Sequence, residues 1–295
     1  MAKSLYQPLT IKNSQTIMLY VVSTPIGNLE DMTFRSVQVL QNVDLIASED
    51  TRNTSKLLRH FQITTPQISY HGHNRNSRIP KLIERLHAGQ AVALVSDAGT
   101  PGISDPGHDL VTACIYEGIS VTPVPGASAL ITALSAAGLP TNKFVFEGFL
   151  PAKITQRRQQ LELLEAETRT MVFYESPHRL RSTLKDLENI LGGERHIVMA
   201  RELTKIYEEF WRGAINDAIV YYTDMKNKPQ GEYTLLISGK LPSQNQFSPE
   251  QIKAELAYMI GQGISRSQAS RELAQTTSLP RRQLYKLALS IDIAE

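Results

Sequence analysis

The chain has 295 residues, of which 41% are hydrophobic, and 31 Lys and Arg against 29 Asp and Glu leave a formal net charge of +2. This length predicts one large domain or two to three small ones, with enough apolar residues for a core. The near-balanced charge by itself excludes no class of partner.

The single cysteine, Cys114, can form neither an internal disulfide nor a zinc site, which indicates a reducing compartment. No apolar run approaches the length of a transmembrane helix. Residues 1–17 lack the apolar core of a signal peptide, so we interpret them as a flexible leader. We therefore expect a cytoplasmic protein.

The first half of the chain alternates short apolar runs with helical patterns. The runs at residues 18–22, 45–47, 91–95 and 119–121 are bounded by turn residues, which predicts strands buried on both faces of a sheet. Loops of small and polar residues follow these strands. Ligands of open α/β sheets bind beyond the carboxyl ends of the strands, so these loops are the candidate site.

Among these loops, the one at residues 96–107 has the most glycine and proline. Its three glycines permit close backbone approach, and its two prolines restrict φ. It contains neither a dinucleotide fingerprint nor a P-loop. Asp97 and Asp105 suit ribose hydroxyls or a cationic ligand better than a polyphosphate. The alternative is a rigid turn with capping acids.

A second series of strands and helices follows a hinge at residues 138–142. Strands are predicted at 144–146, 170–173, 196–200, 209–212 and 232–238, and we expect the final strands to be antiparallel. After a polar linker, three short helices are predicted at 250–260, 267–274 and 281–289. Their spacing resembles a helix-turn-helix appendage, with a helical lid or dimer support as the alternative.

These patterns predict an α/β protein with two βα halves and a cleft between them. The expected boundaries are 18–137 for the N-terminal domain, 138–240 for the C-terminal domain and 248–295 for the helical appendage.

Residues 51–88 carry seven Lys and Arg and one acid, Glu84, which gives a local charge of +6, and four of the seven histidines lie there. A solvated basic face is the ordinary explanation of such a run. Its position beside the candidate loops favours a footprint for an RNA backbone. We expect no metal site. The predicted RNA-binding residues are Lys56, Arg59, His71, His73, Arg75 and Arg78, with Tyr70 also suited to stacking on unpaired bases.

Seven motifs occur in order along the chain: STPIGNLED from Ser23, ASEDTR from Ala47, SDAGTPGISDPG from Ser96, PVPGASA from Pro123, FEGFLP from Phe146, YESPHR from Tyr174 and ARELTK from Ala200. Together they resemble the tetrapyrrole methylase superfamily. More narrowly, they resemble its branch of ribosomal RNA small-subunit methyltransferases, which methylate a cytidine 2′-hydroxyl of 16S rRNA. The superfamily's Gly-Asp-Pro ligand loop is replaced here by residues 97–101, which fits the RNA-modifying branch.

The resemblance implies a class III methyltransferase fold, S-adenosylmethionine bound between two αβα domains, and a homodimer. The implied substrate is 16S rRNA or the assembled small ribosomal subunit. The cofactor contacts that carry over by position are Pro25, Asp97, Ala98, Gly99, Thr100, Pro101, Ser104, Asp105, Pro125, Gly126, Ala127 and Ser128, with Tyr174 and Glu175 less closely matched.

A ribose hydroxyl is a weak nucleophile at neutral pH, so a carboxylate within hydrogen-bond reach would assist the reaction. The candidates are Glu49 and Asp50, with Arg52 binding phosphate or orienting the acid. Glu175 with Arg179, and Glu202 with Arg201 or Lys205, are reserves. Each could instead be a structural ion pair. A small-molecule tetrapyrrole methylase and a non-enzymatic RNA-binding module are the alternative functions.

Overall fold

The computed structural model describes residues 18–240, 249–277 and 279–291. The predicted leader at 1–17 and the linker at 241–248 lie outside this description. The chain forms two compact units that divide after Ser238. None of the described helices combines the length and apolar character that a membrane span requires.

The first sheet has five parallel strands in the order β3-β2-β4-β1-β5. Its strands are β1 (Met18–Val22), β2 (Leu45–Ser48), β3 (Gln67–Ser69), β4 (Val92–Val95) and β5 (Ser120–Val124). The helices of this half are α1 (Phe34–Asn42), α2 (Thr51–His60), α3 (Arg75–His87), α4 (Gly107–Tyr116) and α5 (Ala129–Ala137), with a short 3₁₀ helix, η1 (Leu29–Asp31). Parallel pairing brings the loops after all five strands to one edge.

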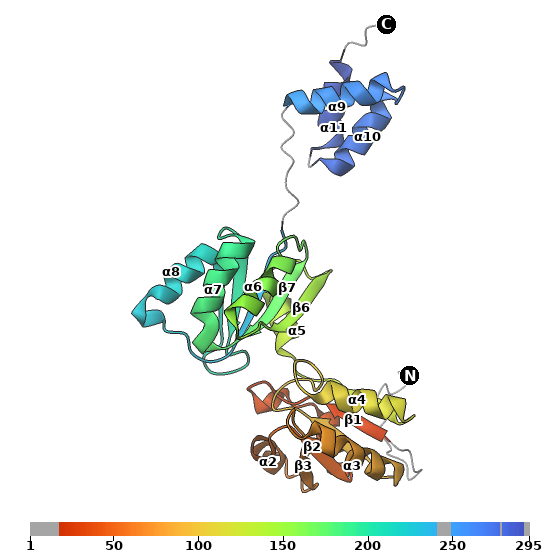
Figure 1. Ribbon diagram of the computed structural model, residues 1–295, viewed down its shortest axis with the longest axis vertical. Helices are drawn as coiled ribbons and strands as arrows, with labels where there is room; N and C mark the ends of the chain where they lie inside the picture. The colour runs from red at the N-terminus through yellow and green to blue at the C-terminus, as the bar shows by residue number, and fades with distance from the viewer. Residues whose placement is uncertain (1–17, 241–248, 278, 292–295) are drawn as a thin grey trace, which may run out of the picture. The chain divides into compact units, whose positions relative to one another are not determined.

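Helices cover both faces of this sheet (Figure 1). Leu82 of α3 and Leu110 of α4 pack in the core on one face, and Leu40 of α1 and Leu58 of α2 pack in the core on the other. All four residues of β4 are therefore buried, as its continuous apolar run predicts.

The second sheet is mixed, in the order β6-β7-β10-β8-β9. Its strands are β6 (Phe144–Phe149), β7 (Thr170–Glu175), β8 (His196–Arg201), β9 (Glu209–Ala214) and β10 (Tyr233–Ile237). β6 and β7 are parallel, and β10 runs antiparallel to both β7 and β8, as β9 does to β8. The expectation of antiparallel final strands is confirmed, and so is the α/β fold class with two layered sheets.

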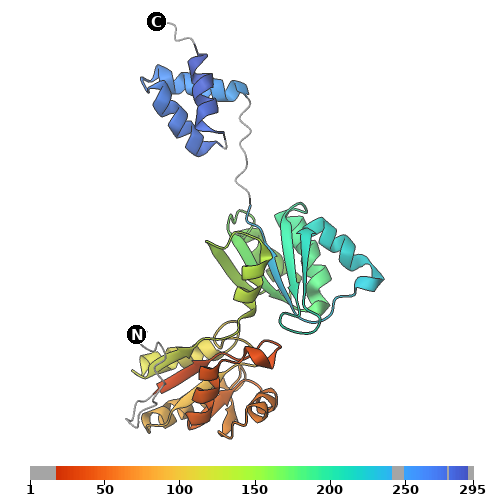
Figure 2. The ribbon, with the colours of Figure 1, turned by 180° about the vertical axis from the view of Figure 1, so that it is seen from behind.

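The helices of the second half are α6 (Ile154–Leu163), α7 (Pro177–Leu191) and α8 (Ile215–Thr223), with a 3₁₀ helix, η2 (Met225–Asn227). They pack on one face of the second sheet (Figure 2). The opposite face is covered by α5, through Ala133, Leu134 and Ala137. Thus α5 follows the first sheet in sequence but completes the core of the second.

Two elements have no counterpart among the predicted ones, β3 and α3. The three residues of β3 are too few for a clear alternation. Pro80 lies inside α3, where it removes one backbone donor, and a proline normally predicts a helix boundary. The Arg-rich segment is helical nonetheless, because Leu82 and Leu86 are fully buried against the sheet.

The second unit contains α9 (Pro249–Gly261), α10 (Arg266–Thr276) and α11 (Arg281–Leu289), which confirms the three predicted helices. They enclose a core of their own that includes Leu256, Leu273 and Leu284.

Candidate functional site

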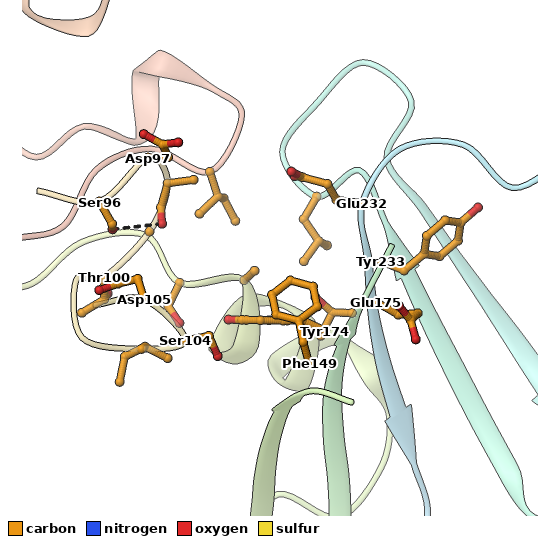
Figure 3. A pocket seen from close by; sticks show the side chains of 18 of the residues that line it. Ser96, Asp97, Thr100, Ser104, Asp105, Phe149, Tyr174, Glu175, Glu232 and Tyr233 are labelled. Carbon is orange, nitrogen blue, oxygen red and sulfur yellow. Dashed lines mark hydrogen bonds between the residues drawn. The ribbon is translucent and has the colours of Figure 1, made fainter. Parts of the chain in front are cut away.

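A cavity of about 510 Å³ lies where loops from the first sheet face strand ends of the second (Figure 3). This volume falls within the range of small-molecule sites, roughly 300–1,000 Å³. The first half contributes Ile26, Glu49, Ser96, Asp97, Ala98, Gly99, Thr100, Ile103, Ser104, Asp105, Ser128 and Ala129. The second contributes Phe149, Tyr174, Glu175, Ser176, Pro177, Ala200, Leu203, Glu232, Tyr233 and Thr234.

Three loops of the first sheet are joined into one wall. Thr24 after β1 and Gly99 after β4 exchange two backbone hydrogen bonds, at 2.9 and 3.1 Å. The Ser23 hydroxyl lies 2.9 Å from the Thr100 hydroxyl, which also donates to the carbonyl of Ala127 at 3.3 Å. The loops after β1, β4 and β5 are therefore fixed to one another before any ligand binds.

Glycines allow close approach at two points of the site. A Cβ on Gly126 would lie 2.9 Å from the Cβ of Ser23, so the loops after β1 and β5 can meet only without a side chain there. Gly148 has φ +63° at the bulge in β6, and a Cβ there would lie 3.0 Å from the Ser104 hydroxyl. Gly148 thus brings the second sheet against the first.

Both aspartates of the loop at residues 96–107 accept hydrogen bonds from backbone N–H groups. Asp105 accepts hydrogen bonds from the backbone N–H groups of Gly102 and Gly107 through one oxygen, at 2.8 and 2.7 Å. Asp97 accepts the backbone N–H of Asp50 at 3.0 Å. Both carboxylates still line the cavity, where they give its wall a negative potential.

Glu49 follows β2 and lines the same cavity. Its Oε2 accepts a hydrogen bond from the backbone N–H of Asp97 at 3.3 Å. Burial raises the pKa of Glu49 above its ordinary value of 4.5; the Asp97 N–H opposes the shift, and the carboxylates of Asp97 and Asp105 add to it. A half-buried carboxylate with a raised pKa at a cavity is a candidate proton acceptor.

Asp50 and Arg52 differ from their neighbour Glu49, because neither lines the cavity. Asp50 is the N-cap of α2, accepts the backbone N–H of Arg52 at 2.8 Å, and pairs with its guanidinium at 2.7 Å. The Arg52 side-chain hydrogen bonds lower the pKa of Asp50 to about 2. Asp50 is thus a capping residue with little basicity.

The second sheet contributes an aromatic wall. The Tyr174 hydroxyl accepts the backbone N–H of Leu130 at 3.2 Å, near the start of α5. Its ring lies 4.9 Å from Phe146 and 5.5 Å from Phe149. Phe149 remains 55% exposed, and Figure 3 shows it beside Tyr174 at the cavity. Burial raises the pKa of Tyr174, so its hydroxyl stays protonated at neutral pH.

The reserve acid Glu175 is already paired. It is buried, bonds Arg179 at 2.9 Å and accepts the Thr183 hydroxyl at 2.6 Å. In Figure 3 its carboxylate points away from the loop that carries Asp97. Both carboxylate oxygens of Glu175 thus have structural partners.

The other reserve acid, Glu202, bonds Lys205 at 2.8 Å. Burial of Glu202 opposes ionisation, but hydrogen bonds from Lys205 and from the backbone of Glu232 outweigh it and lower its pKa. Both reserve pairs therefore have the geometry of structural ion pairs.

The predicted RNA-binding residues fall into two groups. Lys56 and Arg59 are exposed on α2 and Arg78 is half-buried on α3, and none of the three forms an ion pair with a described residue. Arg75 instead pairs with Asp109 of α4. His71 and His73 lie edge to face with ring centroids 6.0 Å apart. No three His, Cys, Asp or Glu side chains of the described residues are arranged for a metal ion.

Most predicted cofactor residues line the cavity, namely Asp97, Ala98, Gly99, Thr100, Ser104, Asp105, Ser128, Tyr174 and Glu175. Pro25, Pro101, Pro125, Gly126 and Ala127 lie in the same loops but not in its lining. Sequence reasoning missed Ile26, Ser96, Ile103, Ala129, Phe149, Ser176, Pro177, Ala200, Leu203, Glu232, Tyr233 and Thr234. Several of these belong to the quoted motifs, whereas Tyr233 and Thr234 of β10, and Glu232 just before it, carry no loop signal.

The chain is similar to known proteins in sequence and in fold. Residues 18–219 match the family model of tetrapyrrole (corrin/porphyrin) methylases. A protein of Synechocystis named ribosomal RNA small subunit methyltransferase I is 58% identical over 276 residues, covering 93% of this chain and 98% of the relative. Its namesake in Escherichia coli is 45% identical over 277 residues, covering 94% and 96%.

Solved structures share the fold at low identity. Cobalt precorrin-4 methyltransferase superposes with a TM-score of 0.56 at 16% identity, over 78% of this chain and 98% of that one. The Thermus thermophilus uroporphyrin-III C-methyltransferase complexed with S-adenosylhomocysteine gives a TM-score of 0.53 at 16% identity, over 76% and 97%.

Proposed function

Because the chain belongs to the tetrapyrrole methylase family, and to its group of ribosomal RNA small subunit methyltransferase I relatives, we propose that it is an S-adenosylmethionine-dependent rRNA methyltransferase. The finer proposal is methylation of the 2′-hydroxyl of a cytidine in 16S rRNA. An enzyme with this substrate would act in the cytoplasm, and we propose a homodimer.

The residues of the cavity fit the cofactor. The joined loops with Gly99 and Thr100 present backbone groups, and the carboxylates of Asp97 and Asp105 suit a sulfonium cation and ribose hydroxyls. Ile26, Ala129 and Leu203 provide apolar surface for an adenine. We assign cofactor binding to these loops, in the places that the resemblance implies. When bound, S-adenosylmethionine supplies an electrophilic methyl group.

Two things are required of the chain: it must align the ribose hydroxyl with the cofactor, and it must accept the proton of that hydroxyl. The rigid loops would align a ribose oxygen for reaction with the bound cofactor, and such positioning is worth several kcal/mol, up to ~11 in favourable cases. Glu49 accepts the proton that the hydroxyl loses as its carbon–oxygen bond forms. A carboxylate with a raised pKa is better matched to this role than the low-pKa Asp50.

The observation that carries the proposal is the position of Glu49 in the lining of a cavity that the joined loops shape. Lys56, Arg59 and Arg78, with His71, His73 and Arg75, remain the proposed RNA contacts. They lie on α2, on α3 and in the loop before α3, which follow β2 and β3 in the chain.

The test is transfer of labelled methyl from S-adenosylmethionine to assembled small ribosomal subunits and to free 16S rRNA, followed by digestion to nucleosides. Label in 2′-O-methylcytidine supports the full proposal, and label in another rRNA nucleoside supports only its coarser part. In a parallel reaction with added uroporphyrinogen, transfer of label to uroporphyrinogen but not to rRNA would favour the tetrapyrrole alternative. Absence of cofactor binding by calorimetry would favour a non-enzymatic module.

A further inference from the structure

His71 follows β3 at the same edge of the sheet at which Glu49 follows β2. β2 and β3 pair in parallel with Ser48 opposite Ser69, and the backbone N–H of Tyr70 donates to the Ser48 carbonyl at 2.7 Å. The ladder thus continues one residue beyond both strands. Glu49 and Tyr70 follow as neighbours, and His71 comes next.

The side chain of Asn74 is turned toward His71. Its Oδ1 accepts the backbone N–H of His71 at 2.9 Å, and its Nδ2 donates to the Ser69 carbonyl at 3.2 Å. A backbone N–H can only donate and a carbonyl can only accept, so these two contacts fix which end of the amide is oxygen. Nδ2 also faces Nε2 of His71 at 3.2 Å.

The orientation of Asn74 favours one tautomer of His71. Nδ2 can only donate, and besides the two Ser69 oxygens it faces Nε2, so this contact favours the neutral imidazole in which Nε2 accepts and the ring proton is on Nδ1. Asn74 is the N-cap of α3 yet makes no side-chain capping bond, although an asparagine cap is typically worth about 1 kcal/mol. The side chain of Asn74 thus contacts the imidazole of His71 instead of capping α3.

The Nδ1 atom of His71 is buried and has no hydrogen-bond partner among the described residues. An unsatisfied buried donor costs roughly 1–3 kcal/mol, so such a group in a native protein calls for an explanation. Glu49 has an unused oxygen, since only its Oε2 forms a hydrogen bond to a described residue.

We propose that His71 is a positioning residue for Glu49: its Nδ1–H, fixed by Asn74, donates to the Glu49 carboxylate in the RNA-bound enzyme and holds it toward the ribose hydroxyl. This inference rests on the proposed function. No bond to the substrate is assigned to His71 in this role; the proton of the hydroxyl goes to Glu49, and the Nδ1 proton stays on the ring.

The surroundings of Glu49 disfavour its ionised form, which a hydrogen bond from His71 would stabilise. Burial and the facing carboxylates of Asp97 and Asp105 raise the pKa of Glu49. A hydrogen bond from the neutral His71 ring would favour the ionised carboxylate and oppose this shift. Arg52, the nearest arginine in sequence, is paired with Asp50. Loss of the His71 donor would therefore raise the pKa of Glu49 further and leave less of the base ionised at neutral pH.

The experiment compares the pH dependence of kcat for the wild type, His71→Asn, His71→Gln and His71→Ala. An asparagine amide nitrogen occupies roughly the place of Nδ1, and a glutamine amide that of Nε2. We expect the acid limb of the profile to move about one unit to higher pH in His71→Ala and His71→Gln, a roughly tenfold loss of kcat at pH values on that limb. His71→Asn should restore the wild-type limb, with KM for RNA changed less than kcat in every variant.

The matched control is His87→Ala, a histidine at the other end of α3 that pairs with Glu117 and should leave the profile unchanged. Imidazole ¹⁵N spectra provide a readout independent of activity, in which wild-type His71 should carry its proton on Nδ1 and lose this preference in Asn74→Leu. A proton on Nε2 in the wild type, or equal rescue by Asn and Gln, overturns the inference. A wild type that methylates no rRNA refutes the proposed function instead, and the spectra still test the tautomer.

Discussion

The carboxylate of Glu49 accepts a hydrogen bond from the backbone N–H of Asp97, 3.3 Å away, and so joins the ends of β2 and β4 at the cavity wall. Asp97 in turn accepts the N–H of Asp50 at 3.0 Å. These contacts direct the side chain of Glu49 to the cavity and leave that of Asp50 to cap α2.

This difference between adjacent acids predicts opposite effects of two similar substitutions. Glu49→Gln should lower kcat by about 10²–10⁴-fold, the usual contribution of a general base, while cofactor affinity is kept. Asp50→Asn retains a good N-cap and should lower kcat by less than about tenfold. Single-turnover methylation and calorimetry measure the two quantities. Equal losses of kcat in both variants would contradict the assignment of Glu49.

Glu49→Gln should also stabilise the ligand-free protein at neutral pH. Burial raises the pKa of Glu49 in the folded state, so folding favours the protonated acid, and ionisation destabilises the fold as pH rises above 4.5. Gln removes this penalty and can still accept the N–H of Asp97. Thermal unfolding from pH 4 to 8 should show a gain in Tm that grows with pH. A constant or shrinking gain would mean that the carboxylate is not destabilising.

Gly126 predicts a steric test of the joined loops. Its missing Cβ would lie 2.9 Å from the Cβ of Ser23, so Gly126→Ala should cost about 1–3 kcal/mol of stability, as overpacking typically does, and weaken cofactor binding. Ser23→Gly removes the clashing atom. The double variant should therefore recover part of both losses, as measured by denaturant unfolding and calorimetry. Strictly additive losses would show that the two loops do not press on each other.

The buried pair of Glu175 and Arg179 should matter for stability rather than for chemistry. Glu175→Ala leaves a partly buried guanidinium unpaired and should cost about 3 kcal/mol, with kcat within a few-fold among molecules that remain folded. Glu167→Ala, which breaks the more exposed pair with Arg169, should cost less. Urea unfolding compares them, and a large drop in kcat for folded Glu175→Ala would return this residue to the candidate bases.

The exposed cations of α2 give the cleanest test of RNA binding. Lys56→Glu with Arg59→Glu should weaken RNA binding and lower the slope of log K against log salt by about 1.4, near 0.7 per lost contact to a single strand. Lys226→Glu with Lys228→Glu, on exposed residues at and after η2, is the matched control. Arg75 is less suitable, because reversal there also breaks its pair with Asp109. Equal slopes in all three proteins would refute the footprint.

Several structural features could be predicted because they depend on neighbours in the chain. The apolar run of β4 is such a local pattern, and the strand appears as expected. The helix over Arg75–His87 could not be predicted, because Pro80 argues locally for a break and only burial of Leu82 and Leu86 against the sheet outweighs it.

The sequence by itself determined the alternation of strands and helices, the small-residue loops at the strand ends and the presence of acids beside them. Only the tertiary structure decided that Glu49 rather than Asp50 lines the cavity, and that Asn74 faces His71. It also placed β10 between β7 and β8. Periodicity and turn chemistry act over a few residues, whereas the direction of a loop side chain and the order of strands depend on contacts between residues far apart in the chain.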